Sequence, residues 1–125
     1  MIYNIQNMKV ILNTENTFQA IKLREQIIKG IKGDIEAVII DTWSYTKSVE
    51  KFDIVFHNPN QYLNDPEKNV LFKLDVDGSF ILLSIVWWKK NPEPSDEMKC
   101  YHVGRLVEML LRHFRNSFIK LSVVD

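Results

Sequence analysis

The first amphipathic stretch of the chain predicts a helix from Thr17 to about Ile31. Its polar residues fall on one side of a helical wheel and its apolar residues on the other. Asn16 or Thr17 is suited to cap its start, and Gly30 or Gly33 to cap its end. The apolar side consists of Ala20, Ile21, Leu23, Ile27, Ile28 and Ile31.

A second, longer helix is predicted between an N-cap at Ser95 and about Asn116. Asp96 and Glu97 lie in its first turn, where the helix dipole favours anions. The predicted buried stripe consists of Cys100, Val103, Leu106, Val107, Leu110, Leu111, Phe114 and, beyond the helix, Phe118.

Shorter stretches that are rich in β-branched and aromatic residues, several of them alternating with polar ones, predict strands. The predicted strands are Met8–Leu12, Ile35–Tyr45, Phe52–His57, Asn69–Val76, Ser79–Lys89 and Ile119–Val124. The order β-α-β-β-β-β-α-β, in one domain over residues 1–125, predicts an α+β fold. We expect a two-layer sandwich, with a mostly antiparallel sheet of about six strands and both helices on one face.

The dipeptide Asp77-Gly78 predicts a tight hairpin that pairs Val76 with Ser79. That register assigns the residues of both strands to two faces. The face expected under the helices carries Val70, Phe72, Leu74, Val76, Ser79, Ile81, Leu83 and Ile85. The opposite face mixes apolar and charged residues, namely Phe80, Leu82, Val86 and Trp88 with Asp75 and Lys73.

This mixed face is too apolar for an ordinary solvated surface. Residues 58–68, a loop with two prolines, or residues 1–7 could cover it, because monomers rarely expose large apolar patches. Alternatively it is an interface with a second copy of the chain or with a different protein, since interfaces favour aromatic residues ringed by charge.

The charges are balanced overall but uneven along the chain. The net charge is zero, which predicts no attraction to nucleic acid or to acidic membranes, whereas residues 34–88 carry nine Asp and Glu against four Lys and Arg. The apolar stretches are too short to cross a bilayer as helices. A single cysteine and the lack of a leader pattern favour a cytoplasmic protein.

Few residues offer catalytic or metal-binding chemistry. Cys100 and His102 lie on different sides of the predicted helix, and His102 and His113 are too far apart along it to share an ion. We therefore predict no metal, an inert Cys100 in the core, and both histidines at the boundary of the helix. The spacing of the four glycines matches no phosphate-binding loop, which predicts no nucleotide cofactor.

The outer face of the second helix carries charges at spacings that suit side-chain pairing, which is typical of a solvated helix. These residues are Tyr101, Arg105, Glu108, Arg112 and Arg115. A basic strip of this kind could also bind phosphate, but it lacks the interleaved aromatic residues that stack on nucleic-acid bases. Asp41 and His57 are the best acid and base candidates if the protein is an enzyme, although neither has a partner that is visible in the sequence.

The sequence leaves three hypotheses for the function. The favoured one is a non-catalytic interaction module, such as a small inhibitor or immunity-type protein, that binds a basic partner through the mixed sheet face. The first alternative is a small-ligand-binding or regulatory domain that dimerises through its sheet. The second is a small enzyme with a cleft near His57 and Asp41.

Overall fold

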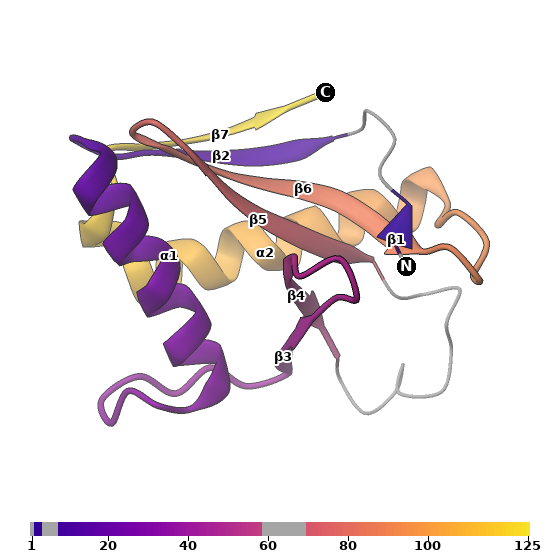
Figure 1. Ribbon diagram of the computed structural model, residues 1–125, viewed down its shortest axis with the longest axis horizontal. Helices are drawn as coiled ribbons and strands as arrows, with labels where there is room; N and C mark the ends of the chain where they lie inside the picture. Colours follow the sequence, from indigo (N-terminus) through magenta and orange to yellow (C-terminus); the bar gives the residue numbers. More distant parts are fainter. Residues whose placement is uncertain (1, 4–7, 59–69) are drawn as a thin grey trace.

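The computed structural model describes residues 2–3, 8–58 and 70–125 (Figure 1). Within these residues it confirms the predicted α+β fold, with six main strands, two helices and the expected order. The elements are β1 (Ile2–Tyr3), β2 (Lys9–Asn13), α1 (Thr17–Lys32), β3 (Trp43–Lys47), β4 (Asp53–His57), β5 (Leu71–Asp77), β6 (Phe80–Trp88), α2 (Asp96–Phe114), η3 (Arg115–Ser117) and β7 (Lys120–Val124).

The strands form one antiparallel sheet in the order β3-β4-β5-β6-β2-β7. β2, near the start of the chain, lies between β6 and β7, so segments from the two ends of the sequence are neighbours (Figure 1). The short strand β1 also pairs with β6, beyond the end of β2. None of the described helices combines the length and the apolar composition that a membrane span requires.

The hairpin between β5 and β6 has a different register from the predicted one. Asp77 pairs with Phe80, so Gly78 and Ser79 form the two-residue loop. Gly78 has φ +60°, and glycine is preferred at the first loop position of a type II′ turn. Each residue therefore pairs two positions away from its predicted partner. Because side chains alternate with a period of two, the assignment of residues to faces is unchanged.

Both helices begin at the predicted caps. In α1, the Asn16 side chain accepts a hydrogen bond from the Gln19 backbone N–H at 2.9 Å, and Gly33 ends the helix at φ +80°. In α2, the Ser95 hydroxyl accepts a hydrogen bond from the backbone N–H of Met98 at 3.2 Å. These contacts satisfy backbone groups that a helix end leaves without partners.

The main core lies between the helices and one sheet face, the face that the hairpin predicts. Phe72, Ile81, Leu83 and Ile85 are completely buried there. The helix side chains in the same cluster are Ala20, Leu23, Ile27, Ile31, Val103, Leu106, Met109, Leu110 and Phe114. A smaller cluster on the opposite face contains Ile54, Leu71 and Val86, with Phe52, Phe56 and Trp88 packed against it.

The predicted strand over Ile35–Tyr45 is wrong in its first part. Residues 34–42 are irregular, and the strand begins only at Trp43. A Cβ atom added to Gly30 of α1 would lie 3.1 Å from Ile40, so this apolar segment packs against the helix instead of joining the sheet. Thr42 follows with φ +66°, a conformation that interrupts an extended chain.

The buried stripe of α2 is rotated from the predicted one. Cys100, expected in the core, is exposed, whereas Lys99 and His102 are buried. The ammonium group of Lys99 forms an ion pair with Glu93 and lies 5.5 Å from the centroid of the Trp87 ring. Because these partners lie outside α2, a helical wheel of α2 alone cannot predict that Lys99 is buried.

Candidate functional site

Asp41 and His57, the two acid and base candidates from the sequence, line the same pocket. The pocket has a volume of about 380 Å³ and opens between the start of β3, the end of β4 and one flank of α2. We call it the α2 pocket. It is lined by Ile39, Ile40, Asp41, Thr42, Trp43, His57, Arg105, Glu108, Met109, Arg112 and His113.

The β3–β4 hairpin brings the two candidates together. Trp43 pairs with His57 across the hairpin, and their ring centroids are 5.4 Å apart. The pairing is extended at the open end, where the backbone N–H of Asn58 donates to the Thr42 carbonyl at 2.5 Å. Asp41 lies just before this bond, so it enters the pocket from the same wall as His57.

The facing wall is the charged flank of α2, whose spacing of charges is typical of a solvated helix. Arg105, Met109 and Arg112 recur at the helical spacing of three or four residues, which places them on one flank. Glu108 lies beside them, with one carboxylate oxygen 3.4 Å from the Arg105 guanidinium. Their spacing on the helix was visible in the sequence, whereas the facing wall depends on tertiary packing.

Both histidines of the pocket have lowered pKa values. Burial is the main cause of the lowered pKa of His57; the positive charge of Arg105 lowers it further, and Glu108 opposes the shift. Burial also lowers the pKa of His113, with Arg112 acting in the same direction and Asp41 against it. Both imidazoles are therefore neutral near pH 7, so each offers one donor and one acceptor nitrogen.

The side chain of His57 is almost completely buried. It is 7% exposed, and its Nδ1 has no hydrogen-bond partner among the described residues. A buried polar atom without a partner costs free energy and calls for an explanation, such as a functional role. Its ring also contacts Tyr101 of α2, with the centroids 6.3 Å apart.

The ring of His102 packs against that of His57, and the prediction that His102 is a boundary residue is wrong. Its side chain is completely buried, and its ring lies 5.3 Å from that of Tyr101, centroid to centroid. Among the described residues, no cluster of three or more His, Cys, Asp or Glu side chains is arranged to hold a metal ion.

The six residues of the mixed sheet face are in different environments. Val86 is completely buried in the small second cluster, and Trp88 packs against that cluster. Leu82 is half-buried, whereas Phe80 is 42% exposed. Lys73 and Asp75 do come together, at 3.6 Å, and the Lys73 ammonium lies 3.9 Å from the centroid of the Phe52 ring. Residues 1 and 4–7, and most of the 58–68 loop, lie outside the described residues.

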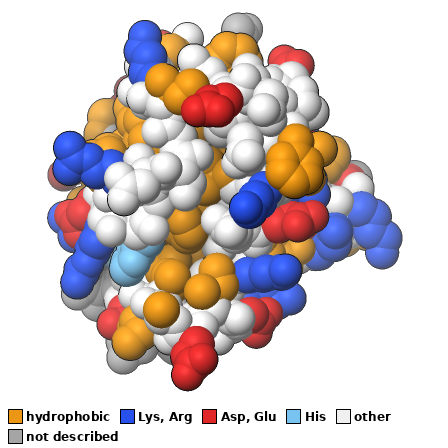
Figure 2. Space-filling model, turned by 90° about the vertical axis from the view of Figure 1, so that its left-hand side faces the viewer, with side chains coloured by type: hydrophobic (Ala, Val, Ile, Leu, Met, Phe, Trp, Pro, Cys, Tyr) orange, Lys and Arg blue, Asp and Glu red, His pale blue; other side chains and the backbone are white. Residues whose placement is uncertain are grey.

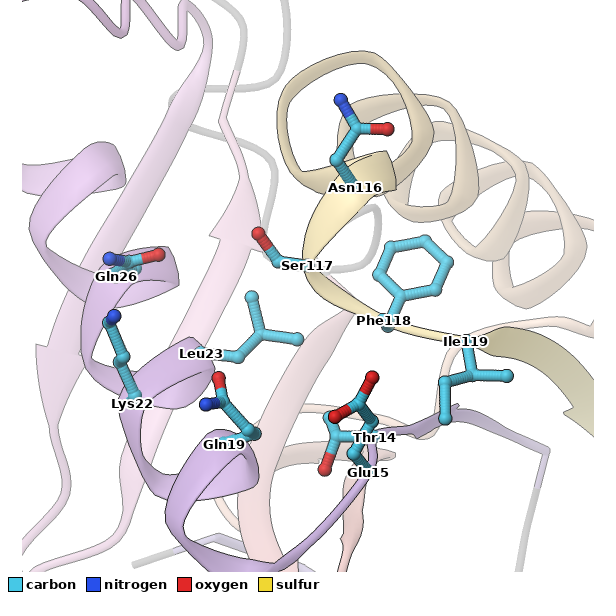
Figure 3. Close-up of a pocket in the computed structure, with 10 residues that line it drawn as sticks. All are labelled: Thr14, Glu15, Gln19, Lys22, Leu23, Gln26, Asn116, Ser117, Phe118 and Ile119. Atoms are coloured by element: carbon cyan, nitrogen blue, oxygen red, sulfur yellow. The ribbon is translucent and has the colours of Figure 1, made fainter.

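A second pocket, of about 490 Å³, opens at the end of the molecule where α1 begins. Figure 3 shows Gln19, Lys22 and Gln26 of α1 on one side of it and η3 with Phe118 on the other. On this end of the molecule, hydrophobic side chains are visible in a central hollow bordered largely by uncharged surface (Figure 2). The charged side chains that line this pocket are Glu15 and Lys22.

Comparison with known proteins found no family model, no curated protein and no solved structure that matches this chain.

Proposed function

We propose that the protein is a small-ligand-binding domain and that the ligand occupies the α2 pocket. The observation that carries this proposal is that Asp41 and His57, singled out from the sequence, line one pocket with Arg105, Arg112 and His113. A concave site with convergent polar groups and shifted pKa values is the usual setting of a ligand site.

The side chains of the pocket favour a small polar ligand with an anionic group. Arg105 is engaged by Glu108, whereas Arg112 provides a second guanidinium suited to bind a carboxylate or a phosphate in a bidentate manner. The carboxylate of Asp41 would accept hydrogen bonds from donors on the same ligand. Trp43 and Met109 supply apolar surface for its uncharged part.

A thermal-shift screen of small anionic and zwitterionic metabolites tests the proposal. A ligand at 100 times its dissociation constant stabilises the folded state by about 2.7 kcal/mol, which raises the melting temperature of a domain of this size by roughly 5 °C or more. Arg112→Ala should abolish this shift. Arg115→Ala is the matched control, because Arg115 is exposed just beyond the same helix and lies outside the pocket.

The screen has two results that contradict the proposal. One is that no compound shifts the melting temperature of the wild-type protein. The other is that the stabilising compounds act equally on Arg112→Ala, which would place their site elsewhere on the molecule.

Protein binding through the mixed sheet face is a second candidate function, and the exposure of Phe80 favours it. An aromatic side chain next to charges is a common anchor of interfaces, and Asp75 and Asp77 lie on the neighbouring strand β5, where Asp77 pairs with Phe80. Phe80→Ala should weaken capture of such a partner and leave the melting temperature nearly unchanged. Unaltered capture by this variant would remove the candidate.

A further inference from the structure

One flank of α2 is apolar but uncovered. The helical wheel placed Cys100, Val107 and Leu111 in the buried stripe, yet Cys100 is exposed, Val107 is half-buried and Leu111 is 43% exposed. Gly104 lies on the same flank, and apart from its chain neighbours and the backbone of its own helix no described heavy atom lies within 4 Å of the position that its Cβ would take. The space beside this flank is open.

The same flank faces β7. The opposite flank of α2 lines the α2 pocket next to β3 and β4, and β3 and β7 lie at opposite ends of the sheet. Leu121 and Val123 of β7 pair with Leu12 and Val10, which are buried on the helix side of the sheet. Their side chains therefore lie on the helix side too, although Val123 is 48% exposed.

We call the uncovered residues of this flank of α2, taken together with the helix-side residues of β7, the β7-edge strip. It consists of Cys100, Gly104, Val107, Leu111, Leu121 and Val123. In the part of the chain that the structure describes, β7 pairs only with β2, so its other edge presents unpaired backbone donors and acceptors. An open, apolar edge strand is a template for pairing with another strand.

We propose that a second copy of this chain docks on the β7-edge strip, with the two β7 strands paired antiparallel about a two-fold axis. Two identical strands can pair in this way around Ser122, the central residue of β7, because antiparallel pairing is self-complementary. The two sheets become one continuous sheet, and Leu121 and Val123 of each copy meet those of the other on the helix side.

The charges of α2 fit this arrangement. The two-fold axis places both α2 helices on the same side of the joined sheet, running in opposite directions. The first turn of α2 contains Asp96 and Glu97, whereas Arg115 directly follows its last turn. The acidic end of each helix then points the same way along the joined sheet as the basic end of the other helix. A parallel arrangement would bring like charges together, which opposes association.

Light scattering after size exclusion, over a range of protein concentrations, tests the dimer. The wild-type protein should have twice the mass of the 14.8 kDa chain. Val123→Glu and Leu111→Glu should raise the dissociation constant at least about 100-fold, because the two-fold axis introduces two like charges. Val49→Glu, which alters an exposed apolar residue in the β3–β4 turn, is the matched control and should remain dimeric.

A cross-linking experiment tests the strand pairing and does not depend on a destabilising variant. In a Cys100→Ser background, Ser122→Cys should form an intermolecular disulfide on mild oxidation, because residues facing each other across an antiparallel pair are within disulfide distance. Ser44→Cys, on the opposite edge strand β3, should not. Circular dichroism verifies that each variant is folded.

A monomeric wild-type protein at every concentration would overturn this inference. So would a dimer that survives both glutamate variants, since it would use another surface. A dimer that Val123→Glu disrupts but that Ser122→Cys does not cross-link would overturn the pairing of the two β7 strands.

Discussion

The imidazole rings of His57 and His102 meet edge to face where β4 packs against α2, with their centroids 5.9 Å apart. His102 is completely buried and His57 nearly so. His57 also lines the α2 pocket, so the contact joins the core to the proposed ligand site. Protonation of His57 would place a positive charge both against the core and next to Arg105.

Acidification should therefore destabilise the protein through His57 and His113. Both pKa values are lowered in the folded state, so the unfolded chain binds more protons as the pH falls through about 6.5, the ordinary histidine value. The contribution of the two neutral histidines to stability is therefore fully present above that pH and is lost as the pH falls through their lowered pKa values. Urea unfolding at several pH values should show a smaller acid loss for His57→Gln than for the wild type. Parallel losses in the two proteins would contradict the burial of a neutral His57.

Asp53 should control the ionisation of Tyr45. The Tyr45 hydroxyl donates to Asp53 at 2.6 Å, and burial together with this carboxylate raises the pKa of Tyr45 to about 12. Asp53→Asn should lower that pKa toward 10, the ordinary tyrosine value, in an ultraviolet titration with Tyr45→Phe as the reference. Because the folded pKa is raised, this contribution to stability is present below pH 10 and is lost as the pH rises through about 12. An unchanged titration would refute the contact.

The rotation of α2 predicts opposite outcomes for two adjacent leucines. Leu110 is completely buried, so Leu110→Ala should lower the free energy of unfolding by about 2–5 kcal/mol. Leu111 is largely outside the core, and Leu111→Ala should cost less than about 1 kcal/mol when measured at a concentration low enough to keep the protein monomeric. Urea denaturation compares the two, and equal losses would contradict the orientation of α2.

In the β5–β6 turn, alanine substitutions at the adjacent residues Gly78 and Ser79 should have different effects on stability. Gly78 has φ +60°, where a side chain clashes with the backbone, so Gly78→Ala should lower the stability by about 1–2 kcal/mol. Ser79→Ala, in the same loop, should change it by less than about 0.5 kcal/mol. If the two variants melted at the same temperature, the left-handed position would not be at Gly78.

Local signals explain why much of the fold was predictable. In each cap, the side chain of Asn16 or Ser95 accepts a hydrogen bond from the backbone N–H three residues later. Such local contacts can be predicted from the sequence alone. The turn after Asp77 was located, but both Asp-Gly and Gly-Ser suit a two-residue loop. The prediction placed the loop at Asp77-Gly78 instead of Gly78-Ser79, which shifted the register by two positions and left the assignment of residues to faces correct.

Tertiary contacts explain the errors. Ile40 is β-branched and suits a strand, yet it packs beside Gly30, which lacks a side chain to exclude it. Lys99 and His102 are polar residues outside the predicted buried stripe, yet they are buried beside the rings of Trp87 and His57. The sequence singled out Asp41 and His57, and separately the charged face of the second helix, but it did not show that the two face each other across one pocket.

Chemical-shift mapping of the labelled protein with the most stabilising anionic ligand tests the central proposal most directly. The α2 pocket predicts that the largest amide shifts occur at Asp41, His57, Arg105 and His113, and that they disappear in Arg112→Ala. Shifts centred instead on the second pocket around Gln19 and Ser117, or no saturable shifts at all, would contradict it.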